Sequence, residues 1–147
     1  MTDILTRIVN LAIRIQQVAA PTFQEAERAR LVQNIFLEEG LDDVEIDKSG
    51  NVLACLKAEH KPTQPPLIVS AHLDTVFPKD TELSIFREGE KIFGPGIGDN
   101  SLGVAGLLGL VWMLRERKIS LPFDTWLAAN TCEEGLGDLR GMRTVVD

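Results

Sequence analysis

The chain has 147 residues, of which 44% are hydrophobic and 25% charged. This is enough for one globular domain with a real core, and it excludes a disordered or low-complexity protein. The formal net charge of −7 argues against a nucleic-acid partner and an anionic membrane surface, because both need clustered Lys and Arg. Solubility explains the charge most simply; carboxylates that attract a metal are the alternative.

The beginning of the chain predicts two helices. Apolar residues recur at helical spacing from Ile4 to Val18, and Pro21 ends that pattern. A second helix should run from Phe23 to Glu39. Thr22 and Glu25 have the spacing of a capping box, in which each side chain accepts a hydrogen bond from a backbone N–H at the start of the helix.

The pattern then changes to the alternation typical of strands. Residues 43–47 alternate between acidic and apolar, residues 49–51 have turn chemistry, and residues 52–56 form the returning strand. The apolar run from Leu67 to Ala71 predicts a central strand. A small hairpin should span residues 83–93.

The last third of the chain predicts a β-α-β unit. A glycine-rich loop is followed by an apolar helix from Leu102 to Arg117 and by a strand over residues 123–131. The apolar run within this helix is too short to cross a bilayer. A final helix should begin near Asp138. The strands at Leu67 and Phe123 should run parallel, and ligands collect beyond the carboxyl ends of such strands.

His72-Leu73-Asp74 lies at the end of the first of these parallel strands. Neutral imidazole is a good zinc ligand, and a neighbouring carboxylate can fix its tautomer and raise its basicity. The alternative is a histidine that merely caps a strand end. On its own, the His-x-Asp pattern is a weak signal.

Asp99 ends the glycine-rich loop Gly94-Pro95-Gly96-Ile97-Gly98 and precedes the apolar helix. The glycine spacing does not match a phosphate-binding loop or a dinucleotide fingerprint, and no Lys follows, so a nucleotide-binding domain is disfavoured. The remaining alternative is a helix N-cap formed by Asp99 or Ser101.

Glu133 and Glu134 directly follow the last strand. Two adjacent carboxylates at a buried strand end repel each other, and a divalent cation can compensate for this, with one carboxylate as ligand and the other free to act as a base. A solvated acidic turn is the alternative. The three segments together are far more specific than any one, since all should meet at one edge of the sheet.

In this combination the segments resemble the co-catalytic zinc family of carboxypeptidase G, peptidase T, aminoacylase, acetylornithine deacetylase and succinyl-diaminopimelate desuccinylase. The resemblance covers nearly the whole chain, in the order and at about the spacing of the family. It implies an α/β fold: a three-layer zinc-peptidase-like catalytic domain with a mixed central sheet flanked by helices. It also implies a cis peptide bond between Asp99 and Asn100.

The roles of individual residues follow from the resemblance alone. His72 matches a ligand of one zinc, Glu134 a ligand of the other, and Asp99 the carboxylate that bridges both. Glu133 matches the catalytic general base that takes a proton from the bridging water. Asp74 matches the acid that supports His72. The expected cofactor is two Zn²⁺ per complete site, with Co²⁺ or Mn²⁺ as alternatives.

The chain departs from the family pattern after the Glu-Glu pair. Family members supply a further carboxylate ligand, a distal His ligand and a lid or dimerisation domain, which residues 1–147 do not show. The expectation is therefore the N-terminal part of a metallopeptidase catalytic domain, truncated at the C-terminus.

Two functions remain open from the sequence. The first is a zinc-dependent hydrolase of amide bonds in small peptides or N-acyl amino acids. The second is an inactive truncated fragment that binds metal weakly or self-associates, so a homo-oligomer is a further expectation. The two cysteines, Cys55 and Cys132, lie in apolar segments, and no secretory signal is visible, so a cytoplasmic location is expected.

Overall fold

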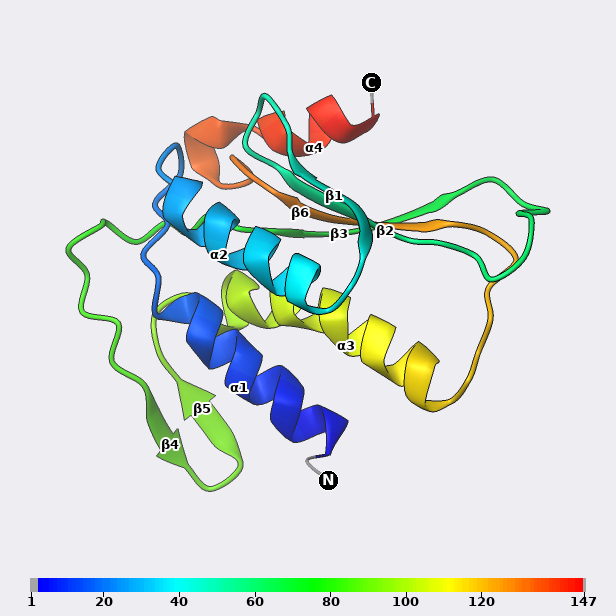
Figure 1. Ribbon diagram of the computed structural model, residues 1–147. Helices are drawn as coiled ribbons and strands as arrows, with labels where there is room; N and C mark the ends of the chain where they lie inside the picture. Colours follow the sequence, from blue (N-terminus) through cyan, green and yellow to red (C-terminus); the bar gives the residue numbers. More distant parts are fainter. Residues whose placement is uncertain (1–2, 147) are drawn as a thin grey trace.

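The computed structural model describes residues 3–146, which form one mixed α/β unit (Figure 1). A four-stranded sheet has the strand order β1-β2-β6-β3, and a separate two-stranded hairpin consists of β4 and β5. The strands are β1 (Asp42–Ile46), β2 (Val52–Leu56), β3 (Leu67–His72), β4 (Phe86–Glu88), β5 (Lys91–Phe93) and β6 (Thr125–Asn130). The helices are α1 (Ile4–Gln16), α2 (Ala26–Glu38), α3 (Leu102–Glu116) and α4 (Arg140–Val146), with short helical turns η1 (Ile97–Ser101) and η2 (Gly135–Gly137).

The layers agree with the predicted fold class. In Figure 1, α1, α2 and α3 cover one face of the sheet, and the short α4 lies on the other side near β6. β3 and β6 run parallel, with His72 opposite Asn130, whereas β1, β2 and β6 pair antiparallel. The predicted β-α-β unit is therefore confirmed, and its strands end side by side.

Helix α3 supplies much of the core. Its apolar side chains pack against α1 and β3, and Val104, Ala105 and Val111 are at most 1% exposed. The helical run Ile97–Glu116 has 20 residues and a mean hydropathy of 1.4, long and apolar enough by length and composition to cross a membrane. This run joins η1 to α3, and its backbone is not helical at Asp99 and Asn100, so α3 itself begins at Leu102 as predicted. Packing against α1 and β3 accounts for the apolar character of α3.

β3 was predicted as a central strand, and this was wrong. Within the described residues it is the edge of the sheet, and both Leu67 and Ile68 are substantially exposed. An apolar run indicates that a segment can be buried on both faces, but it does not specify its neighbours, which depend on long-range pairing.

A buried asparagine links the β1–β2 turn to the end of β6. The Asn51 side chain accepts a hydrogen bond from the Thr131 N–H (2.9 Å) and donates one to the Gly141 carbonyl (3.0 Å). Asp47 closes the turn by accepting from the Ser49 and Asn51 N–H groups. These bonds fix the position at which the chain leaves β6, directly before Glu133.

Candidate metal centre

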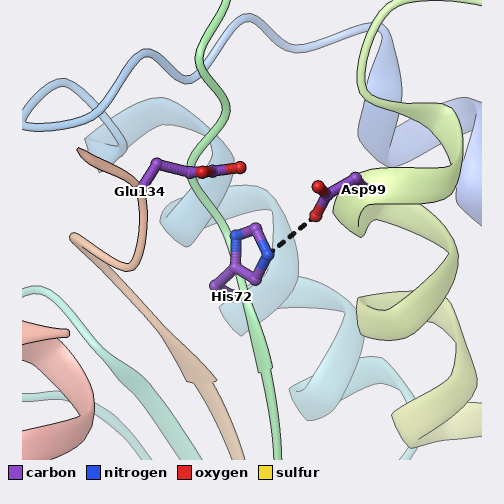
Figure 2. Close-up of side chains that lie close together, drawn as sticks. All are labelled: His72, Asp99 and Glu134. Carbon is purple, nitrogen blue, oxygen red and sulfur yellow. Dashed lines mark hydrogen bonds and ion pairs between the residues drawn. The ribbon is translucent and has the colours of Figure 1, made fainter. Parts of the chain in front are cut away.

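Three acidic or basic side chains meet at the carboxyl edge of the parallel strands. His72 ends β3, Glu134 follows β6, and Asp99 lies in η1, immediately before α3 (Figure 2). One potential ligand atom from each of the three lies within 4.8 Å of the others. The structure thus brings together the three residues that the sequence singled out as metal ligands.

The distances around His72 are those of a charged cluster. His72 Nε2 lies 2.9 Å from Asp99 Oδ1 and 3.9 Å from Glu133 Oε2. His72 Nδ1 lies 3.0 Å from the Asp74 backbone carbonyl, which can only accept, so Nδ1 carries a proton. Nε2 is therefore the nitrogen of His72 that can take a metal once its own proton has left.

Asp74 is completely buried beneath the cluster and connects its parts. Its carboxylate accepts hydrogen bonds from the N–H groups of Glu133 (2.9 Å) and Glu134 (3.0 Å) and from the Thr22 hydroxyl (2.9 Å). Asp74 Oδ1 also lies 3.7 Å from His72 Nδ1. One carboxylate thus holds the two segments that carry His72 and the Glu pair at a fixed separation.

The ionisation of these groups reflects the shared charge. Burial lowers the pKa of His72, but hydrogen bonding to Asp74 and the carboxylates of Glu133 and Asp74 outweigh this and raise it to about 9. Burial raises the pKa of Asp74, but hydrogen bonds from His72, two backbone N–H groups and Thr22 outweigh it and lower the pKa to about 2. Burial and the negative charge of Asp99 raise the pKa of Glu134.

Two residues that support the centre were misassigned from the sequence. Thr22 and Glu25 do not form a capping box, since α2 begins only at Ala26 and its first turn has no side-chain cap. Thr22 donates to Asp74, and the Glu25 carboxylate accepts from the Cys132 N–H (3.0 Å), the residue before Glu133. A local spacing rule could not find these roles, because both partners are distant in sequence.

Arg28 is a third buried support that the sequence analysis missed. Its guanidinium donates to the carbonyls of Leu73 (2.7 Å) and Val18 (2.8 Å), and so connects α2 to the segment between His72 and Asp74. Burial lowers the pKa of Arg28 to about 10, although the negative charge of Asp74 opposes this. Its position in the first turn of an otherwise ordinary helix gave no signal of this function.

The loop that carries Asp99 has an unusual backbone. Gly96 adopts the left-handed conformation with φ +69°, and a Cβ there would come within 2.9 Å of the Thr75 side chain, so glycine is required. The peptide bond between Asp99 and Asn100 is cis, as the family resemblance implied. The exposed Asp99 carboxylate faces His72 from this loop.

The donor set fits a divalent transition-metal ion. One imidazole and clustered carboxylates are ligands that zinc accepts, and His72, Asp99 and Glu134 are close enough to share it. Burial raises the pKa of Glu134, and the negative charge of Asp99 adds to this, as expected for neighbouring carboxylates that repel one another. A bound cation would relieve this repulsion.

The family model for peptidase family M28 matches residues 51–144, the part of the chain that contains His72, Asp99 and Glu134. The chain belongs to peptidase family M28. No curated protein matches it at a significant level.

Solved peptidase structures share the fold of this M28 chain. The aminopeptidase PepT from Bacillus cereus has a TM-score of 0.79 and 23% identity, over 94% of this chain and 39% of its own. A tripeptidase from Staphylococcus aureus has a TM-score of 0.76 and 19% identity, over 97% of this chain and 40% of its own. YxeP from Bacillus subtilis, described as a dinuclear metal-binding peptidase of the M20 family, has a TM-score of 0.66 and 20% identity, over 97% of this chain and 38% of its own.

The family model confirms the predicted family, and the solved structures confirm the fold class. The chain spans about 40% of the length of the first two solved structures that it matches. At identities below 25% the structures show the fold alone. The roles of His72, Asp74, Asp99, Glu133 and Glu134 therefore stay predictions, supported by the geometry of the centre.

Proposed function

We propose that this M28 chain carries the metal centre of a zinc-dependent hydrolase that cleaves amide bonds in small peptides or N-acyl amino acids. The observation that carries the proposal is the convergence of His72, Asp99 and Glu134 within 4.8 Å, with Glu133 beside them. Membership of a peptidase family supports the reaction class.

In the proposed centre, His72 would be a ligand of one Zn²⁺, Glu134 a ligand of the second, and Asp99 a ligand of both. Two bound divalent cations would polarise the scissile carbonyl and lower the pKa of water between them. Co²⁺ or Mn²⁺ could occupy the same donors. Asp74 holds the Nδ1 side of His72, so that Nε2 points at the centre.

Glu133 is the proposed general base. Its Oε2 lies 3.9 Å from His72 Nε2, so the carboxylate faces the centre, and its side chain remains partly open to solvent. The proton that Glu133 takes from water can be passed to the leaving amine. The Asp74 carboxylate fixes the backbone N–H of Glu133 and so orients the base.

Small peptides are favoured over N-acyl amino acids as substrates. The solved structures of the same fold include an aminopeptidase, a tripeptidase and an aminoacylhistidine dipeptidase, although a hydantoinase/carbamoylase family amidase is also among them.

We also propose a cytoplasmic location, which the free, buried Cys55 and Cys132 support.

The test is a hydrolysis assay of the complete gene product with Zn²⁺ against dipeptides, tripeptides and N-acyl amino acids. Metal content is measured on the same sample. Turnover that requires the metal and is lost with a chelator supports the proposal. Bound metal without turnover on any of these substrates supports the alternative of an inactive metal-binding domain. A protein that binds no divalent cation refutes both.

A further inference from the structure

A pocket of about 370 Å³ opens next to Cys132, the residue that precedes the proposed base Glu133. The pocket lies between the start of α2, the turn that joins β1 to β2, and the segment after β6. None of the proposed metal ligands lines it, and neither does Asp74 or Glu133. The pocket is therefore separate from the metal site, although it is one residue away from it along the chain.

Three cationic side chains line this pocket, although the protein as a whole has a net charge of −7. Arg30 comes from α2, Lys48 from the β1–β2 turn and Arg140 from the start of α4. None of them forms an ion pair with a described residue. Arg140 donates to the Cys132 Sγ (3.2 Å), and its Cζ lies 5.3 Å from the centre of the Phe23 ring. The positive charge of this wall is therefore free to attract an anionic group.

Two carboxylates also line the pocket, and they differ in what they bind. Asp47 accepts hydrogen bonds at both oxygens, from the Ser49 and Asn51 N–H groups and from the Asn51 side-chain amide. Glu25 is 5% exposed, and its Oε1 accepts from the Cys132 N–H, but no hydrogen bond from a described residue reaches its Oε2. A buried carboxylate oxygen without a donor is costly, so Glu25 favours a ligand that brings a cationic donor.

Much of the remaining wall is apolar and is formed by Phe23, Ala26, Ala29 and Ile46. The pocket thus combines a cationic wall, one carboxylate oxygen without a donor, and an apolar surface. The zwitterion of an α-amino acid carries the complement of all three: a carboxylate, an ammonium group and a side chain. A simple anion would face the negative charge of Glu25, and an uncharged apolar molecule would leave every charge in the pocket without a partner.

We propose that this pocket binds a free α-amino acid, with its carboxylate towards the cationic wall and its ammonium group towards Glu25. The site goes beyond the proposed function, because binding there needs neither a metal nor turnover. Glu25 and Arg140 both contact Cys132, so the ligand is connected to Glu133 through a single residue. Amino acids are also what complete hydrolysis of a peptide releases, so the site links a product of the proposed reaction to the segment that carries the base.

The test titrates leucine, N-acetylleucine, leucinamide and acetate into the 147-residue chain at neutral pH. EDTA is present throughout, so that no bound metal contributes. Binding is followed by the backbone amide NMR signals of Cys132 and Glu133. Leucine should bind with a dissociation constant of about 1 mM or below. N-acetylleucine lacks the ammonium group and leucinamide lacks the carboxylate, so each should bind about tenfold more weakly. Acetate should bind more weakly still.

Variants assign each charge of the ligand to its wall. Glu25→Gln keeps an oxygen that accepts from the Cys132 N–H but removes the negative charge. It should weaken leucine and leucinamide about tenfold and leave N-acetylleucine unchanged. The double variant Arg30→Gln/Lys48→Gln should weaken leucine and N-acetylleucine about tenfold and leave leucinamide unchanged. Arg87→Gln, at an exposed position on β4 outside the pocket, is the matched control and should bind all three as the wild type does.

Three results would overturn the proposal. Equal affinity for leucine, N-acetylleucine and leucinamide would mean that only the side chain is bound. Acetate that binds as tightly as leucine would make the pocket an anion site and remove the role of Glu25. Unchanged leucine affinity in the double variant would place the ligand elsewhere, and this variant decides the matter even if Glu25→Gln does not fold, since Arg30 and Lys48 are exposed. All of these measurements are made without metal, so the proposed function stands or fails independently of them.

Discussion

The buried Asp74 gives this protein a specific acid sensitivity that can be isolated by mutation. Burial alone would raise its pKa, but interaction with His72 and hydrogen bonds from the Glu133 and Glu134 N–H groups and the Thr22 hydroxyl lower it to about 2, against an ordinary value of 3.8. A carboxylate whose pKa is lowered by folding stabilises the folded state above its unfolded pKa. That contribution is lost as the pH falls towards the folded value.

The size of the effect follows from the two pKa values. The side chain is fully buried, so solvent screening does not reduce it. Linkage gives a loss of about 1 kcal/mol of unfolding free energy by about pH 3 and about 2 kcal/mol by about pH 2. His72 does not interfere in this range, because its folded pKa of about 9 keeps it protonated and an unfolded His is protonated there too.

The assay is urea unfolding of the wild type and of Asp74→Asn from about pH 6 to about pH 2. The variant is less stable at neutral pH, and the difference between the two proteins should shrink by about 2 kcal/mol across this range. Asp80→Asn, at an exposed position, is the control and should follow the wild type. A difference that stays constant with pH would refute the assigned role of the Asp74 charge.

Four further predictions concern the metal centre. Glu133→Gln should lower turnover of the complete gene product on the order of 10²–10⁴-fold and leave zinc content unchanged; a matching loss of zinc would make Glu133 a ligand instead. Because the pKa of metal-free His72 is about 9, zinc binding at neutral pH should release about one proton, and zinc affinity should rise about tenfold per pH unit up to about pH 9. Calorimetry in buffers of different ionisation enthalpy measures the proton release. Thr22→Val should weaken zinc binding roughly tenfold through Asp74, while Thr22→Ser restores it; equal affinities in both variants would remove Thr22 from the support of the centre. The 147-residue chain alone should show little hydrolysis, since its described residues offer three candidate ligands for two metals where about three per catalytic zinc is usual; rapid turnover with two bound zincs would contradict this.

The misassigned capping box shows where local sequence rules stop. Thr22 and Glu25 have the correct spacing to cap α2, and nothing nearby in the chain argues against it. In the fold, Thr22 contacts Asp74, 52 residues away, and Glu25 contacts Cys132, 107 residues away. Buried partners displaced the local ones, because a buried carboxylate must find strong donors and the first turn of α2 can be satisfied by water.

The edge position of β3 has the same origin. Residues 67–71 are apolar enough for a central strand, but strand order depends on which segments return to the sheet. Within residues 3–146, β6 pairs with one side of β3 and leaves Leu67 and Ile68 exposed. Likewise, Arg28 lies on an unremarkable helix, and only packing shows that its guanidinium is buried against the carbonyl of Leu73.

The sequence by itself determined the elements, the parallel β-α-β unit and the residues that meet at its carboxyl edge. These depend on short-range periodicity, on the handedness of the crossover connection and on side-chain types of distinctive chemistry. Only the tertiary structure decided that Asp74 links Thr22 to the Glu133–Glu134 backbone, and that Glu25, Arg30 and Arg140 line one pocket beside Cys132. Hydrogen-bond partners and concave surfaces are made by segments far apart in the chain, and no local pattern encodes which of them come into contact.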